Sequence, residues 1–206
     1  MAAGGNEAVT TGAGTEEWKK VPGLLLLEEF ISEEEASQLL AQLDSLPWGG
    51  RGVEPNPELR RRTQQFGYQF SFRTRTIEKD LGPLPPFLDG VVQRMQSCGI
   101  FPEAPPDLLL VNEYDRGQGI MPHVDAPSFG PTVTSLSLCS PCIMTFTKVD
   151  SGDATHVILQ PRSLLVLRDD ARYKYKHGIS KEDVEMHNGH TIERGRRVSL
   201  TFRTKT

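Results

Sequence analysis

The sequence contains few cysteines and no long apolar run. Cysteine occurs three times in 206 residues, and a small odd number argues against a disulfide framework and for a reducing compartment. The C-x-x-C pair Cys139 and Cys142 lacks a second pair or a helix start, so we expect a structural role. The longest apolar run, residues 24–27, is far shorter than the ~20 residues of a membrane span. We therefore expect a protein without a membrane segment, located in the cytoplasm, the nucleus or both. We also expect a monomer.

An excess of positive charge is also absent, since the net charge is −4 and the pI is 5.8. Proteins that coat nucleic acid without specificity depend on such an excess, so this class is disfavoured. A local exception is the segment 51–75, which contains six arginines and only two glutamates and so carries an excess of positive charge. One interpretation is a solvated loop. The other is a lid that stacks on a base and holds its phosphates, because the basic residues Arg61 and Arg62 flank the aromatic residues Phe66 and Tyr68.

The remaining pattern predicts one mainly β (α+β) domain over residues 18–206, with residues 1–17 as a disordered tail. A capping box at Ser32 to Glu35 predicts a helix that ends near Pro47, and apolar spacing predicts a second helix over residues 85–98. Both helices are expected to support a sheet. Residues 182–194 are polar and predict a flexible insertion. Short strands, typical of a sandwich or jelly roll, are predicted at 108–114, 132–138, 143–148, 155–159, 163–167, 173–176 and 196–204.

A possible metal site begins at His123-Val124-Asp125. If this tripeptide is extended, the period of two places His123 and Asp125 on the same face. A second histidine, His177, follows 52 residues after Asp125. Two histidines and one carboxylate form the facial triad of non-haem iron(II) oxygenases. Because H-x-D alone also occurs by chance, the prediction depends on the neighbouring motifs.

The segment 197–203 alternates polar with apolar residues and is predicted to be a strand. One face carries Arg197, Ser199, Thr201 and Arg203. Such a face is often solvated. The alternative is an inward polar face that holds a dicarboxylate, because a guanidinium binds a carboxylate through two hydrogen bonds and keeps its charge.

Together these blocks resemble the AlkB family of iron(II)- and 2-oxoglutarate-dependent dioxygenases over residues 20–205. The matching motifs are Asn112-Glu113-Tyr114, Gly119-Ile120, His123-Val124-Asp125, His177-Gly178-Ile179 and R-V-S-L-T-F-R. The F-G-Y-x-F and H-x-D-x-x-S contexts also resemble the oxygenase domain of AlkB homologue eight. The resemblance implies a double-stranded β-helix, that is, a jelly roll, and the cofactors Fe(II), 2-oxoglutarate and dioxygen.

The resemblance also implies a role for each matching residue. Iron would be held by His123, Asp125 and His177, and the cosubstrate by Asn112, Tyr114, Arg197, Ser199, Thr201 and Arg203, with Arg197 on its distal carboxylate. Ser199 departs from the asparagine that many members carry there. Arg172 and Tyr175 are expected to contact substrate.

Three function classes follow. The first is oxidation of a methyl or side-chain carbon on a nucleobase in RNA or DNA, by demethylation or hydroxylation. The tRNA wobble uridine is one such substrate, and alkylated DNA or RNA is another, because the sequence shows no RNA-recognition motif or methyltransferase domain. The second class is a 2-oxoglutarate oxygenase of protein or a small molecule. The third, a noncatalytic module, is disfavoured because the predicted triad and both arginines are present.

Overall fold

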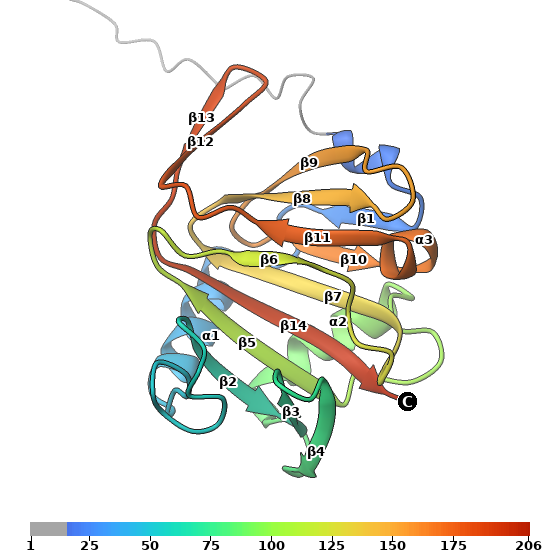
Figure 1. Ribbon diagram of the computed structural model, residues 1–206. Coiled ribbons are helices and arrows are strands. Elements are labelled where there is room, and N and C mark those ends of the chain that lie inside the picture. The colour runs from blue at the N-terminus through green and yellow to red at the C-terminus, as the bar shows by residue number, and fades with distance from the viewer. Residues whose placement is uncertain (1–15) are drawn as a thin grey trace, which may run out of the picture.

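The computed structural model describes residues 16–206, and most of the predicted tail lies outside the described residues. Two antiparallel sheets face each other (Figure 1). Their arrangement matches the predicted mainly β jelly roll. The major sheet has the order β1 (Leu24–Leu27), β10 (Leu164–Leu167), β7 (Phe129–Cys139), β14 (Arg197–Lys205), β5 (Leu108–Tyr114), β2 (Arg62–Phe66). The minor sheet has the order β6 (Ile120–His123), β11 (Tyr175–Ile179), β8 (Cys142–Lys148), β9 (Ala154–Leu159).

Helices cover the outer face of the major sheet, as Figure 1 shows for α1 (Glu33–Asp44) and α2 (Asp89–Ser97). The predicted capping box is confirmed: the Ser32 hydroxyl accepts from the Glu35 N–H, and the Glu35 carboxylate accepts from the Ser32 N–H. Arg94 of α2 donates to both Glu35 oxygens and joins the two helices. The other helical segments are short: η1 (Glu17–Lys20), η2 (Pro86–Leu88) and α3 (Asp169–Tyr173). Among the described residues, every helix is too short or too polar to span a lipid bilayer.

Side chains of β14 point alternately into the hydrophobic core and into the space between the two sheets. Val198, Leu200 and Phe202 are fully buried against the helices, where they join a cluster with residues of α1 and α2. Because successive side chains of a strand point to opposite faces, Arg197 and Arg203 point between the two sheets. The predicted polar face of residues 197–203 is therefore the inner face of the jelly roll.

Two local predictions were wrong. Tyr173 does not begin a strand, because it ends the short helix α3 and β11 starts at Tyr175. The expected flexible insertion at 182–194 is a hairpin of β12 (Val184–His187) and β13 (His190–Glu193), which projects from the sheets in Figure 1. Its turn residues Asn188 and Gly189 both have positive φ, as a two-residue hairpin turn requires.

A buried ion pair fixes the base of this hairpin. Arg194 lies 3.4 Å from the carboxylate of Glu185, and both side chains are almost fully buried. Glu185 also accepts hydrogen bonds from the Ile143 N–H and the Ser180 hydroxyl. These polar groups satisfy one another inside the protein, which a freely moving loop could not achieve.

Candidate active site

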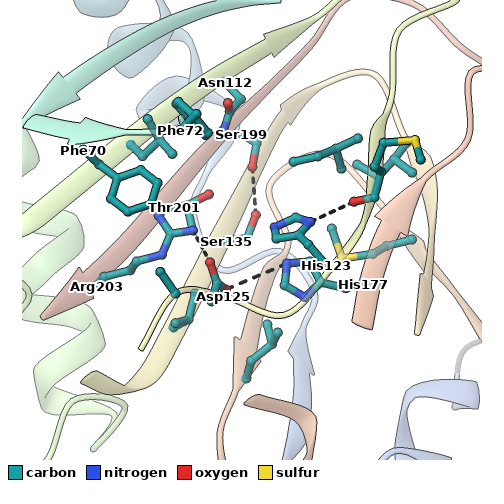
Figure 2. A pocket seen from close by; sticks show the side chains of 18 of the residues that line it. Phe70, Phe72, Asn112, His123, Asp125, Ser135, His177, Ser199, Thr201 and Arg203 are labelled. Atoms are coloured by element: carbon teal, nitrogen blue, oxygen red, sulfur yellow. Dashed lines mark hydrogen bonds and ion pairs between the residues drawn. The ribbon is translucent and has the colours of Figure 1, made fainter. Parts of the chain in front are cut away.

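The structure brings His123, Asp125 and His177 together between the two sheets (Figure 2). One possible ligand atom from each residue lies within 4.8 Å of the others. The two histidines are register partners across β6 and β11, and their ring centroids are 4.5 Å apart. Asp125 does not extend the strand as predicted, because β6 ends at His123 and a turn closed by the Phe129 N–H and the Ala126 carbonyl follows. Its carboxylate reaches the histidines from this loop.

Each of the two histidines has an unprotonated ring nitrogen that can bind a metal ion. The Nδ1 of His123 lies 2.9 Å from the carbonyl oxygen of Met121. Because a carbonyl can only accept, Nδ1 carries the proton and Nε2 is free, as in many metal-binding histidines. Burial lowers the pKa of His177 to about 4, and the nearby Asp125 only partly opposes this shift. His177 is therefore neutral at neutral pH.

The Asp125 carboxylate is buried but charged. Burial alone would raise its pKa, whereas the positive charge of Arg203 holds the pKa well below its usual range. Arg203 donates to Oδ1 at 2.7 Å, as the dashed line in Figure 2 shows. Within residues 16–206, Oδ2 of Asp125 has no hydrogen-bond partner, and it lies 3.8 Å from Nε2 of His177. A metal cation bound by one ring nitrogen of each histidine and by Oδ2 of Asp125 would give this oxygen the partner that it lacks. The three residues therefore fit iron(II).

A cavity of about 320 Å³ extends from the triad toward Arg197. The Arg197 side chain is 1% exposed and donates to the Ser137 hydroxyl at 2.9 Å. Among the described residues no carboxylate pairs with it. A buried guanidinium without an acidic partner is costly, and a ligand carboxylate would supply that partner. The remaining predicted cosubstrate residues also line the cavity: Asn112, Tyr114, Ser199, Thr201 and Arg203.

The mouth of the cavity is formed partly by the hairpin of β3 (Tyr68–Ser71) and β4 (Thr76–Asp80). The Arg61 guanidinium lies 5.1 Å from the centroid of the Phe72 ring and donates to the Asn112 side chain at 2.7 Å. Arg75, between the two strands, donates to the Val124 carbonyl at 2.8 Å. Two cations, Arg61 and Arg75, and the Phe72 ring therefore line this part of the cavity.

Three of the residues predicted for the lid lie elsewhere. Arg62 pairs with the buried carboxylate of Glu113 on the face of the sheet that the helices cover. Phe66 packs edge-on against Phe87 on that same face. Tyr68 lies under the ammonium group of Lys205 and does not line the cavity. Successive side chains of β2 point to opposite faces of the sheet. The register of β2 against β5 therefore decides which of them face the cavity.

The two contacts predicted before His177 were also wrong. Arg172 is 2% exposed and donates to backbone carbonyls, and Tyr175 is packed in an apolar cluster formed by residues of both sheets. Neither lines the cavity.

Several residues that line the cavity were not predicted from the sequence, and Phe70 and Ser135 are examples. Phe70 was part of the F-G-Y-x-F block. Ser135 and Ser137 alternate with buried leucines, and Ser135 shares a 2.8 Å hydrogen bond with Ser199 (Figure 2). This alternation on β7 could have identified the serines before the structure was known.

A jelly roll with an N,N,O donor set and an inner arginine that has no acidic partner among the described residues is typical of iron(II)- and 2-oxoglutarate-dependent oxygenases. In agreement, residues 23–203 match the family model described as the 2OG-Fe(II) oxygenase superfamily. Within this class the chain belongs to the AlkB family, and its cofactors are Fe(II), 2-oxoglutarate and dioxygen.

Individual relatives support this membership. The "Alkylated DNA repair protein ALKBH8 homolog" of Arabidopsis thaliana is 36% identical, over 89% of this chain and 58% of that protein. The "Probable RNA/DNA demethylase ALKBH6" of Danio rerio is 32% identical, over 88% of this chain and 85% of that protein. The solved structure titled "The structure of OsALKBH1" has a TM-score of 0.64 at 19% identity, covering 89% and 98% of the two chains, and supports the fold. The chain thus spans little more than half of the plant relative.

Proposed function

We propose that this protein oxidises a methyl or side-chain carbon on a nucleobase in RNA or DNA. The observation that carries the proposal is the pairing of the Arg61 guanidinium with the Phe72 ring at the cavity mouth, 5.1 Å apart. A base can stack on such a ring while a cation holds its phosphate. The names of the plant and fish relatives, which refer to DNA repair and RNA/DNA demethylation, are consistent with this substrate class.

The residues that line the cavity would have different roles in the reaction. His123, Asp125 and His177 would hold iron(II), which, when bound, couples dioxygen activation to decarboxylation of 2-oxoglutarate and oxidation of a C–H bond. Arg197 would bind the distal carboxylate of the cosubstrate and orient it toward the metal. Arg203 keeps Asp125 ionised and directs only one carboxylate oxygen at the metal position.

The substrate base must leave any duplex to reach this site, because the triad lies inside the cavity between the sheets. Single-stranded, looped or flipped-out nucleotides are therefore the expected substrates. An oxidised N-methyl group would be lost as formaldehyde, whereas an oxidised side-chain carbon would remain as an alcohol. We further propose that the protein acts as a monomer in the cytoplasm, the nucleus or both.

Mass spectrometry of nucleosides tests the proposal. Total RNA, purified tRNA and genomic DNA would be incubated with enzyme, iron(II) and 2-oxoglutarate, with Asp125→Ala as the matched inactive control. We expect loss of a methylated nucleoside, or gain of a hydroxylated one, only with the wild-type enzyme. A change confined to tRNA wobble uridines would narrow the substrate. Succinate formation with protein or small-molecule substrates and no nucleoside change would contradict the proposal and support the second class of oxygenase.

A further inference from the structure

The three triad residues are not held in place by the same kind of structural contact. His123 and His177 face each other across the hydrogen-bonded ladder of β6 and β11, which sets their separation. Asp125 lies after β6 ends, and β7 begins only at Phe129. No strand pairing holds the intervening backbone in the described structure. Another contact must therefore fix Asp125 relative to the histidines.

Arg172 supplies this contact. Its side chain is almost fully buried, and each guanidinium nitrogen donates to a backbone carbonyl of residues 125–130, which form the loop and the start of β7. The acceptors are the backbone carbonyls of Asp125 at 3.1 Å, Ala126 at 2.9 Å, Phe129 at 3.0 Å and Gly130 at 3.2 Å. Four carbonyls of one short segment, two in the loop and two at the start of β7, thus converge on one planar cation.

The position of Arg172 in the chain gives these bonds a further effect. Arg172 belongs to α3, five residues before His177 on the adjoining strand β11. The guanidinium therefore connects the loop of one triad residue to the segment that carries another. Because the group is planar and its donors are fixed in direction, it sets both distance and orientation. A lysine ammonium could satisfy only some of the carbonyls.

Burying the Arg172 cation among neutral acceptors costs free energy, and its four hydrogen bonds offset that cost only while residues 125–130 keep this conformation. Arg172 does not line the cavity and cannot contact substrate or cosubstrate there. Arg203 already holds the side chain of Asp125, whereas Arg172 holds its backbone. The two arginines together restrain the carboxylate from both ends.

We propose that Arg172 is a positioning residue of the metal site, which braces the Asp125 loop against the His177 strand and so preorganises the triad for iron(II). This inference is independent of the substrate class proposed above. It concerns metal affinity, and its failure would leave the nucleic-acid proposal untouched.

The test is anaerobic titration of the metal-free protein with iron(II), comparing wild type with Arg172→Met and Arg172→Lys. Loss of a residue that orients metal ligands typically weakens metal binding by about 10- to 100-fold. We expect at least tenfold weaker binding for Arg172→Met and an intermediate value for Arg172→Lys. Hydrogen exchange at the backbone amides of Val124, Asp125, Ala126 and Ser128 should accelerate in both variants before metal is added.

Arg168→Met is the matched control. Arg168 also donates to two backbone carbonyls, those of Gly99 and Ile100, but these lie on the loop after α2. We expect this variant to lose thermal stability and keep its iron(II) affinity within twofold. The proposal is overturned if a folded Arg172 variant binds iron(II) as tightly as wild type, or if Arg168→Met loses equal affinity. If Arg172→Met does not fold, Arg172→Lys decides. Failure of both to fold would assign Arg172 to the fold alone and also overturn the proposal.

Discussion

The buried pair of Arg203 and Asp125 allows a quantitative prediction for Arg203→Met. The two side chains are 7% and 4% exposed, and the nitrogen–oxygen distance is 2.7 Å. Methionine keeps much of the volume but leaves a buried carboxylate without its cation. Removing one partner of such a pair typically costs about 3–5 kcal/mol of unfolding free energy. For a chain of this size, that loss corresponds to a fall in Tm of roughly 6–20 °C.

The assay is thermal and urea unfolding of the metal-free protein, followed by circular dichroism. Lys174→Met serves as a control, because Lys174 pairs with Asp170 on the surface and such pairs contribute under about 0.5 kcal/mol. Asp125→Asn and the double variant complete a thermodynamic cycle. We expect the double variant to lose clearly less than the sum of the single losses. Additivity within about 0.5 kcal/mol would refute the reasoning.

Three further predictions concern the cosubstrate, the lid and the helices. Arg197→Ala should raise the KM for 2-oxoglutarate about 30-fold or more, since a charge without its partner costs roughly 2–5 kcal/mol; an unchanged KM would assign the carboxylate to another residue. Arg61→Glu should weaken binding of short methylated oligonucleotides, whereas Arg62→Glu should lower only stability, and equal losses of binding would contradict the lid assignment. Hydrogen bonds from Arg94 lower the pKa of Glu35 to about 2 from an ordinary 4.5, so the stability lost in Glu35→Gln should be full above pH 4.5 and vanish toward pH 2. This loss should not exceed about 1 kcal/mol because the pair is one-third exposed, and a difference that persists at pH 2 would disprove the linkage.

Features set by local periodicity could be predicted from the sequence. The alternation of residues 197–203 separates Arg197 from Val198 whatever the rest of the chain does, and the structure places these side chains on opposite faces of β14. The Ser32 capping box is likewise a local hydrogen-bonding pattern. The convergence of His177 on His123 required the family resemblance, because 52 residues of chain separate His177 from the H-x-D motif.

Features set by strand register and tertiary contacts could not be predicted in the same way. Arg61 and Arg62 are adjacent in sequence, yet one lines the cavity and the other pairs with Glu113 behind the sheet. Composition alone does not distinguish the two arginines, because a shift of one residue in strand register would move each of them to the opposite face of the sheet. Arg172 resembled a substrate contact because it precedes His177, but its partners are backbone carbonyls of residues 125–130, more than 40 residues earlier in the chain. By contrast, the Asn188-Gly189 turn was a readable signal for the β12–β13 hairpin.

The central claim is that His123, Asp125 and His177 together hold one iron(II) ion. Its most direct test is to measure bound iron and succinate formation side by side in wild type, His123→Ala, Asp125→Ala and His177→Ala, each shown to be folded. We expect one iron per wild-type chain, little bound iron in each variant, and no succinate from any of the three. Normal turnover with full iron content in any folded variant would contradict the assignment of that residue to the metal.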